Sequence, residues 1–281
     1  MQTNNKILTK NFEKNIFFNE KLSKYSWFNL GGPAKIFFKP ENDLQLVKFL
    51  KIVEKDIPIN CLGAGSNTLI RDGGYNGVII KLSPKFSFIN KEEKNIIEVG
   101  AATLDKKLSN YALENSLSGF EFLSCIPGSV GGAIIMNSGC YTNEISQILL
   151  SIKTVDRKGR LKVINSDEIK FCYRGTNLPK DLIILSAKFK GSISKKEEIN
   201  KKQSYFIEKK KLSQPSQVKT CGSTFKNISK EKKAWMLIKE AGCESFAEGD
   251  AMISKKHCNF FVNNGKAKSI DIENLIKKVK N

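Results

Sequence analysis

The residues best suited to chemistry lie in two glycine-rich segments about sixty residues apart, 62–69 (LGAGSNTL) and 126–133 (IPGSVGGA). Each segment follows an apolar stretch, and its small residues let backbone N–H groups approach a phosphate closely. Two such turns suit a diphosphate that is held from two sides. The chemistry they indicate is the binding of a dinucleotide cofactor.

The first turn departs from the dinucleotide-binding fingerprint of Rossmann folds. Gly63 and Gly65 have the right spacing, but Thr68 stands where the third glycine belongs. The sequence also has no acidic residue at the end of a second strand about twenty positions later, where that fold places its ribose ligand. We therefore expect a dinucleotide site of another kind.

The first turn is predicted to lie in a small β-α-β-β unit. Residues 34–39, 58–62 and 77–82 have the composition of strands, and Asn42 is typical of a residue that caps a helix after the first of them. One face of this helix is apolar and consists of Leu46, Phe49, Leu50 and Val53.

The second turn is predicted to follow a strand at 96–99 and a helix that begins at Thr103. A hairpin with its turn at 156–159, an apolar strand at 182–189 and a charged surface helix at 194–211 come next. One side of the helix after Thr103 is expected to consist of Leu104, Leu108, Tyr111 and Ala112.

Composition points to a globular chain. Of its 281 residues 40% are hydrophobic, and no apolar run approaches the ~20 residues of a membrane span. The N-terminal segment also lacks the apolar core of a signal peptide, so we expect a cytoplasmic protein without a membrane partner. The seven scattered cysteines form no Cys-x-x-Cys pair and predict neither a zinc site nor disulfides. We expect them to be buried, and we expect no metal.

The formal charge of +19 raises the alternative of a basic nucleic-acid-binding module. Only four of the 47 basic residues are arginines, and they form no cluster. Sequence-specific readers of bases favour arginine for bidentate contacts. We therefore interpret the charge as a lysine-rich solvated surface that attracts anionic substrates, and we expect no nucleic-acid partner.

Seven motifs, in this order, resemble the UDP-N-acetylenolpyruvoylglucosamine reductases, the MurB flavoenzymes of peptidoglycan synthesis. The resemblance covers residues 25–280. The motifs are NLGGPA at 29–34, GAGSNTL at 63–69, IPGSVGGA at 126–133, MNSG at 136–139, YR at 173–174, CGSTFKN at 221–227 and HxNFxVN at 257–263.

The resemblance implies an α+β fold: a two-subdomain FAD-binding region of the vanillyl-alcohol-oxidase (PCMH) type, followed by a smaller α+β substrate domain. The expected divisions are a lead-in at 1–25, FAD-binding subdomains at 26–84 and 85–192, and a substrate domain at 200–281. The residues that would cradle the FAD diphosphate are Gly63, Ala64, Gly65, Ser66, Asn67, Thr68, Leu69, Pro127, Gly128, Ser129, Gly131, Gly132 and Ala133.

The reaction implied is the NADPH-dependent reduction of UDP-N-acetylglucosamine enolpyruvate to UDP-N-acetylmuramate through FAD. Arg174 matches the family's catalytic arginine, whose fixed charge would stabilise the enolate as it forms. Ser223 matches the serine that protonates C2 of the substrate.

The resemblance also bears on the setting of the protein. A monomer is expected, with roles in cell-wall biogenesis, cell shape, the cell cycle and cell division.

Three further residues are candidates for substrate binding. Tyr173 precedes the catalytic arginine, and Lys211 and Asn227 match positions that contact the UDP diphosphate in relatives. His257, the one histidine, is interpreted as structural. The segment from Arg174 to Lys211 is short, which places the chain with the compact type that lacks the substrate-covering tyrosine loop.

No residue matches the family's third catalytic residue, a glutamate on a strand that follows the helix at 269–280. Glu273 lies on that helix and is not assigned the role. We expect the chain to be truncated, because Ile272, Leu275, Ile276 and Val279 would otherwise leave an apolar face exposed. An FAD-binding homologue with little or no turnover is therefore an alternative function.

Overall fold

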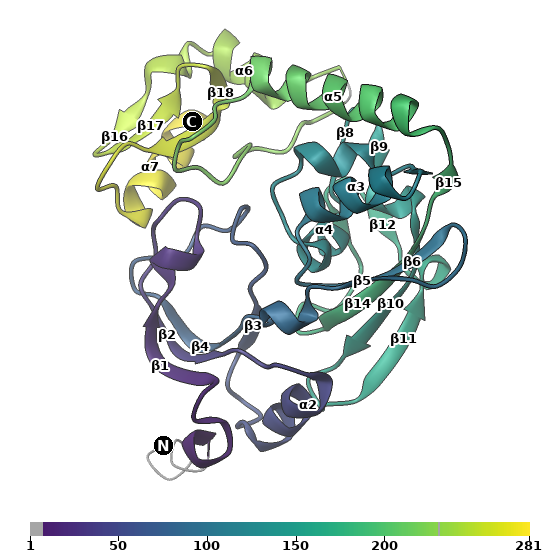
Figure 1. Ribbon diagram of the computed structural model, residues 1–281. Helices are drawn as coiled ribbons and strands as arrows, with labels where there is room; N and C mark the ends of the chain where they lie inside the picture. The colour runs from purple at the N-terminus through teal and green to yellow at the C-terminus, as the bar shows by residue number, and fades with distance from the viewer. Residues whose placement is uncertain (1–7, 230) are drawn as a thin grey trace. The chain divides into compact units, whose positions relative to one another are not determined.

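The computed structural model describes residues 8–229 and 231–281, coloured along the chain in Figure 1. The described chain divides into two compact units. Unit 1 consists of residues 8–18, 36–64 and 77–207, and unit 2 consists of residues 19–35, 65–76, 208–229 and 231–281. The domain boundaries predicted from the sequence stay a prediction. Within the described residues, every helix is too short or too polar to cross a membrane.

The first sheet has four strands, and a capped helix lies in the chain between two of them. Its order is β1 (Ile16–Lys21), β2 (Pro33–Phe38), β4 (Tyr75–Ile80), β3 (Ile59–Cys61), and β3 pairs with β4 in parallel. The helix α2 (Asp43–Ile52) begins after Asn42, whose side chain accepts a hydrogen bond from the Gln45 amide at 2.9 Å. The predicted cap is confirmed, and so is the apolar face, since all four of its residues are buried.

The second sheet lies entirely in unit 1 and is antiparallel throughout. Its order is β11 (Leu161–Asn165), β10 (Leu149–Val155), β14 (Ile183–Lys190), β6 (Ile96–Gly100), β5 (Ile89–Lys91). The predicted hairpin and the predicted apolar strand are confirmed. The central position of β14 explains its nearly continuous burial, because both of its edges and both of its faces are covered.

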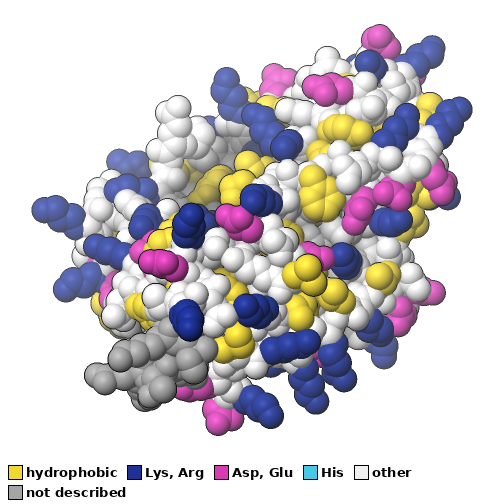
Figure 2. Space-filling model, turned by 60° about the horizontal axis from the view of Figure 1, so that its bottom comes forward, with side chains coloured by type: hydrophobic (Ala, Val, Ile, Leu, Met, Phe, Trp, Pro, Cys, Tyr) yellow, Lys and Arg dark blue, Asp and Glu magenta, His cyan; other side chains and the backbone are white. Residues whose placement is uncertain are grey.

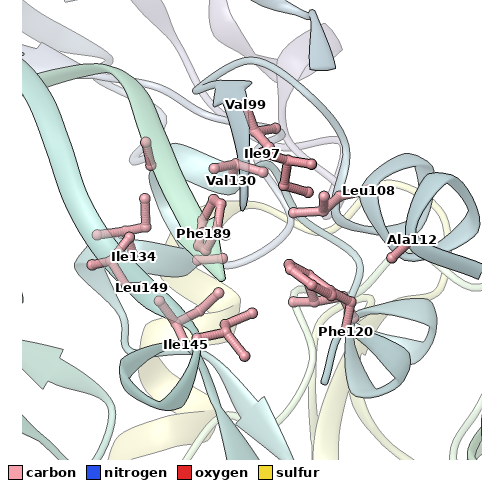
Figure 3. Packing of buried hydrophobic residues seen from close by; sticks show 14 of the residues in the cluster. Ile97, Val99, Leu108, Ala112, Phe120, Val130, Ile134, Ile145, Leu149 and Phe189 are labelled. Carbon is pink, nitrogen blue, oxygen red and sulfur yellow. The ribbon is translucent and has the colours of Figure 1, made fainter. Parts of the chain in front are cut away.

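The predicted helix α3 (Asp105–Glu114) packs against this second sheet, and so does α4 (Val130–Ile135), a helix that was not predicted from the sequence. Figure 3 shows side chains of α3, α4, β6, β10 and β14 meeting in one apolar cluster. Its labelled members include Leu108, Val130 and Phe189, none of which is accessible to solvent. Leu104 was expected on the apolar side of α3, but this is wrong: Leu104 is the N-cap residue, lies before the first turn, and is 55% exposed.

A second apolar cluster of unit 1 joins α2 to both sheets. Leu46, Phe49 and Leu50 of α2 pack there with residues of β2, β3 and β4 and with Val155 and Leu185 of the second sheet. Phe49 stacks on Phe38 with ring centroids 3.9 Å apart. Ile59 of β3 and Ile80 of β4, which flank the first glycine turn in the chain, belong to this cluster, so both ends of that segment are fixed by apolar packing.

Short elements connect these parts. Three strand pairs are β7 (Leu117–Ser118) with β15 (Ser192–Ile193), β8 (Gly139–Cys140) with β9 (Asn143–Glu144), and β12 (Phe171–Cys172) with β13 (Gly175–Thr176). The 3-10 helices are η1 (Leu22–Tyr25), η2 (Pro84–Phe86), η3 (Glu121–Cys125), η4 (Ile145–Gln147), η5 (Ser166–Glu168) and η6 (Cys243–Ser245).

Unit 2 is built on the antiparallel sheet β16 (Ala247–Glu248), β17 (Ala251–Ser254), β18 (His257–Asn263). The charged helix α5 (Lys196–Ser213) leads into this unit, which also contains α6 (Ala234–Glu240) and α7 (Ser269–Lys280).

The apolar face of α7 is covered, contrary to our expectation. Ile272 and Leu275 are buried in the core of unit 2, and Ile276 and Val279 pack against it while partly exposed. The expected exposure is wrong because β17 and the chain around Ala267 supply the packing surface.

The charged side chains are distributed as predicted, whereas the cysteines are only in part buried as predicted. On the face in Figure 2, Lys and Arg side chains are spread out, with Asp and Glu side chains among them. Four of the seven cysteines are buried as expected, but Cys140 is partly exposed and Cys61 and Cys172 are exposed. Both are the last residue of a short strand.

Candidate active site

The first glycine turn begins where β3 ends. The amide of Leu62 donates to the carbonyl of Ile80 at 2.8 Å, and the carbonyl of Gly63 accepts a hydrogen bond from Lys81 Nζ at 2.7 Å. A methyl group on Gly63 would lie 2.7 Å from Ser129 Oγ of the second turn. Unit 1 therefore brings the start of the first turn directly against the second.

The rest of the first turn, from Gly65, belongs to unit 2. Gly65 has a φ of +70°, and a methyl group there would overlap the carbonyl oxygen of Tyr25 at 1.8 Å. The carbonyl of Gly65 accepts from the Trp27 amide at 3.0 Å, and that of Thr68 accepts from Cys221 Sγ at 3.3 Å. Glycine is therefore required at position 65, because a side chain would meet both a strained φ and a backbone atom.

The second turn is held against the start of α3 by its own backbone. The carbonyl of Gly128 accepts from the Asp105 amide at 3.1 Å, and the amides of Val130 and Gly131 donate to carbonyls of the 101–103 segment at 2.9 Å each. These bonds fix the turn and the first residues of α4, independently of any side chain in the turn.

Asp105 is the unusual group of this turn. Its side chain is fully buried, and a methyl group on Gly128 would lie 2.5 Å from Asp105 Oδ2. Neither carboxyl oxygen has a hydrogen-bond partner among residues 8–229 and 231–281. Burial raises the pKa of this carboxyl to about 8, because a charge is poorly solvated there.

Arg174 occupies the two-residue turn between β12 and β13. Its φ of +57° is uncommon outside glycine, and its guanidinium donates to the backbone carbonyls of Asn137 and Gly139. The guanidinium also lies 5.0 Å from the ring centroid of Tyr173. Strained backbone of this kind persists where its surroundings fix it, which is common at functional sites.

Ser223 lies in a loop that Asn259 of β18 holds in place. The Thr224 amide donates to the Asn259 carbonyl at 2.8 Å, and the Phe225 amide and carbonyl each bond to the Asn259 side chain at 2.9 Å. Ser223 itself is exposed and follows Gly222, which has a φ of +81°. The hydroxyl is thus presented to solvent from a loop fixed on both sides.

The predicted substrate-binding residues differ in their exposure and in the hydrogen bonds of their side chains. Tyr173 is 48% exposed beside Arg174. Asn227 uses its side-chain oxygen to accept from the Ala234 amide at 3.0 Å, at the start of α6. Lys211 is exposed in the last turn of α5.

His257 fits the predicted structural role. Its Nδ1 accepts a hydrogen bond from the Asn259 amide at 3.2 Å, and burial lowers its pKa below the ordinary value. Its ring packs edge-on against Phe260. Since His257 accepts at Nδ1, the neutral ring carries its proton on Nε2.

The catalytic residues predicted from the sequence belong to different units, Arg174 to unit 1 and Ser223 to unit 2. Their joint action stays a prediction. Glu273 pairs with Arg71 within unit 2, at 2.8 and 3.2 Å. This pairing agrees with the decision not to assign Glu273 as the third catalytic residue.

Sequence reasoning missed Asp105 and Lys81, the ionisable side chains that lie against the two turns. An aspartate at the start of a helix is common and usually exposed, and lysine is the most abundant basic residue of this chain. The contacts with Gly128 and Gly63 are long-range, so no local signal could have found either residue.

Comparison with known proteins covers both parts of the chain. The FAD binding domain profile matches residues 34–165, and the profile for the UDP-N-acetylenolpyruvoylglucosamine reductase C-terminal domain matches residues 214–281. The reductase of Pelagibacter ubique is 46% identical over 94% of this chain and 88% of its own length.

Comparison with solved structures leads to the same family. The crystal structure of the Thermus caldophilus reductase (MurB) has a TM-score of 0.83 and 32% identity, covering 94% of this chain and 93% of the other. Berberine bridge enzyme from Eschscholzia californica is similar in fold alone, with a TM-score of 0.51, 13% identity, and coverage of 69% of this chain and 44% of its own. The predicted α+β fold with a PCMH-type FAD-binding region is confirmed. The chain therefore belongs to the UDP-N-acetylenolpyruvoylglucosamine reductase (MurB) family.

Proposed function

We propose that this chain is an FAD-containing reductase that uses NADPH to convert UDP-N-acetylglucosamine enolpyruvate to UDP-N-acetylmuramate, a step of peptidoglycan precursor synthesis. The observation that carries the proposal is the contact of Gly63 with Ser129 in unit 1, in a chain of this family. Two glycine turns that meet can bind one diphosphate from two sides.

The residues at the two turns are suited to binding a diphosphate. Gly132 is exposed, and a methyl group there would meet no nearer atom than Ser129 Oγ at 3.7 Å, so a ligand can approach this backbone. Lys81 provides a cation beside Gly63. We propose that residues 63–69 and 127–133 hold the FAD diphosphate. The chemistry that bound FAD supplies is the transfer of hydride from NADPH to the enolpyruvyl carbon.

Arg174 would bind the substrate carboxylate. Its guanidinium is always charged, and the carbonyls of Asn137 and Gly139 already fix its position. As the enolpyruvyl group gains negative charge, a fixed cation at the carboxylate stabilises the charge without having to reorganise.

Ser223 would deliver the proton that completes the product. Its hydroxyl is exposed and its loop is held by Asn259, so the donor is positioned before the substrate binds. A hydroxyl is a weak acid, but an enolate carbon is basic enough to take its proton. Tyr173, Lys211 and Asn227 are proposed to bind the rest of the substrate.

An anaerobic stopped-flow experiment tests the function. NADPH first bleaches the bound flavin, and UDP-N-acetylglucosamine enolpyruvate then restores its colour. Ser223→Ala should slow the second step by about 10²–10⁴-fold and leave the first unchanged, since only the second needs the proton. The exposed Ser216→Ala is the matched control. A flavin that the substrate never reoxidises would instead favour the homologue without turnover.

The setting of the enzyme is part of the proposal. We propose a cytoplasmic monomer without nucleic-acid or membrane partners, whose product serves cell-wall biogenesis and so cell shape, the cell cycle and cell division. Light scattering of the purified protein, with and without DNA, tests the monomer and the lack of a nucleic-acid partner. A mass above that of one 31.5 kDa chain would contradict the first, and DNA-induced association would contradict the second.

A further inference from the structure

Arg174 is carried by a hairpin that is too short to be stable by itself. The strands β12 and β13 have two residues each, and Arg174 lies in the turn between them. A hairpin of this size has little stability of its own, so contacts with other segments must fix it. The carbonyls that bind the guanidinium, those of Asn137 and Gly139, belong to another segment. The position of the charge therefore depends on what connects the hairpin to residues 137–139.

The side chain of Asn137 makes this connection. Its Nδ2 donates to the Cys172 carbonyl at 3.3 Å, two residues before Arg174. Its backbone carbonyl accepts from Arg174 Nη1 at 3.4 Å. One residue thus binds both the strand that leads to Arg174 and the guanidinium itself. A further bond, from the Thr176 hydroxyl to the Ile135 carbonyl at 3.4 Å, holds the strand that follows Arg174.

The Asn137 amide is also held from its other side. Its Oδ1 accepts from the Ser146 amide at 3.1 Å, so only one orientation of the side chain satisfies both partners. Ser146 follows the hairpin of β8 and β9, whose turn residues Tyr141 and Thr142 have φ values of +50° and +68°. A threonine with positive φ is an outlier that persists only where its surroundings hold it. Asn137 therefore connects two short hairpins, each with strained residues in its turn.

The residue type suits this position. Asn137 has a φ of +39°, and asparagine is among the non-glycine residues that adopt positive φ most readily. Its amide supplies a donor and an acceptor together, whereas a carboxylate supplies acceptors alone and an aliphatic side chain supplies neither. The residue is only 1% exposed, so its side chain is not available to a substrate. An effect of Asn137 on the reaction would have to pass through Arg174.

We propose that Asn137 is a positioning residue of the reaction: its amide fixes the hairpin against residues 137–139 and so holds the Arg174 guanidinium where the substrate carboxylate binds. This inference rests on the proposed function, which gives Arg174 that role. A cation that is already in place stabilises the developing charge without first reorganising. Loss of the amide would keep the charge but release its position, and a displacement of about 1 Å can slow a reaction about 10²-fold.

The first test observes Arg174 without any ligand. Asn137→Gly removes the amide, keeps the backbone carbonyl and tolerates the positive φ. Nitrogen NMR of the guanidinium groups is simple in the FAD-free protein, because the chain has only four arginines. In wild type both Nη atoms of Arg174 are bound to carbonyls, so rotation about the Nε–Cζ bond is slow and their signals should be separate.

In Asn137→Gly the two Nη signals of Arg174 should merge, while those of the other three arginines stay as in wild type. Arg174→Ala assigns the signals by removing them. Unchanged Arg174 signals in Asn137→Gly would overturn the proposal.

The second test is the stopped-flow experiment on the FAD-loaded protein. Asn137→Gly should leave flavin reduction by NADPH within about twofold of wild type and slow reoxidation by UDP-N-acetylglucosamine enolpyruvate about 10- to 100-fold. Asn177→Ala is the matched control: it removes an exposed side chain of the same hairpin region, one that accepts from the Lys170 amide at 2.9 Å, and should stay within about twofold in both steps. An equal loss in Asn177→Ala would assign the effect to general weakening of the hairpin and overturn the proposal.

A double-mutant cycle separates positioning from a structural role. In an Arg174→Ala background no guanidinium is left to position, so Asn137→Gly should slow reoxidation further by no more than about twofold. If Asn137→Gly has the same effect with and without Arg174, the proposal fails. Thermal unfolding identifies variants that do not fold, and Asn137→Ser, which is too short to bond to both Cys172 and Ser146, then takes the place of Asn137→Gly.

The outcomes distinguish this inference from the proposed function. If the substrate does not reoxidise the flavin of the wild-type protein, the proposed function fails, and the positioning role fails with it. If wild type reacts and Asn137→Gly reacts equally fast, only the inference about Asn137 fails.

Discussion

The two glycine turns differ in the ionisable side chain that lies against each of them. At the first, Lys81 donates to the carbonyl of Gly63 and provides a cation. At the second, Asp105 packs against Gly128 as an acid without a charged partner. Burial lowers the pKa of Lys81 and raises that of Asp105, because it disfavours the charged form of each.

The turns also differ in construction. The second lies wholly in unit 1 and is fixed by backbone bonds to the start of α3. The first begins in unit 1 and continues in unit 2 from Gly65, where its conformation depends on Tyr25 and Trp27. Substitutions at the two turns should therefore affect different properties of the protein.

The largest effect is expected from Gly65→Ala. The new methyl group would overlap the Tyr25 carbonyl and the residue would keep a φ of +70°, so the free energy of unfolding should fall by about 3 kcal/mol or more. Gly132→Ala, in the open part of the second turn, is the control and should cost less than about 0.5 kcal/mol. Urea unfolding of the FAD-free proteins measures both. Equal losses would show that the turns are built alike.

Asp105→Asn should stabilise the FAD-free protein at pH 7. The folded pKa of about 8 lies above the ordinary 3.8, so folding takes up a proton between those values and stability falls as pH rises through that window. Removing the titration returns about 4 kcal/mol at pH 7, reduced to roughly 2 kcal/mol by burial of the amide.

Urea unfolding at two pH values tests this prediction. At pH 4 the wild-type carboxyl is protonated in much of the unfolded ensemble as well, so the gain should disappear and the cost of burying the amide should leave the variant less stable than wild type. Equal stability of the two proteins at pH 7 would mean that Asp105 is not held as a neutral acid. A stabilised variant would show that burial of the carboxyl beside the second turn costs stability.

Local patterns predicted much of the fold. Asn42, the apolar face of α2 and the run of β14 are encoded within a few residues, and each is confirmed. The prediction failed for Leu104 and for the face of α7, because exposure there depends on which distant segments pack nearby.

The motifs of the candidate site could be predicted from the sequence, but the burial and the shifted pKa values of its ionisable groups could not. The glycine turns, Arg174 and Ser223 stand in motifs that can be recognised without a structure. Asp105 and Lys81 gain their environment from contacts across about twenty residues, so their burial and shifted pKa values arise only on folding.

Lys81→Gln should weaken FAD binding about tenfold at pH 7, because a charged hydrogen-bond donor is lost beside the diphosphate. The difference from wild type should narrow as pH rises, since the low pKa of Lys81 removes its charge in the wild type too. Lys85→Gln, which breaks an exposed pair with Glu41, is the matched control and should leave affinity unchanged. Equal binding by Lys81→Gln at pH 7 would remove the contrast between a charged and a neutral turn.

The smallest effects are expected just beyond the first turn, where unit 2 anchors it to α7. The Asp72 carboxylate accepts from the Ser269 amide at 3.0 and 3.1 Å and the Ser269 hydroxyl accepts from the Asp72 amide at 2.9 Å, so Asp72→Ala should cost about 1 kcal/mol of unfolding free energy. Arg71→Gln breaks a pair with Glu273 in which the arginine is largely exposed, so it should cost less unfolding free energy than Asp72→Ala. Thermal unfolding ranks the two. If Arg71→Gln lost more unfolding free energy than Asp72→Ala, the ion pair with Glu273, rather than the hydrogen bonds to Ser269, would be the main contact that fixes the chain after the first turn.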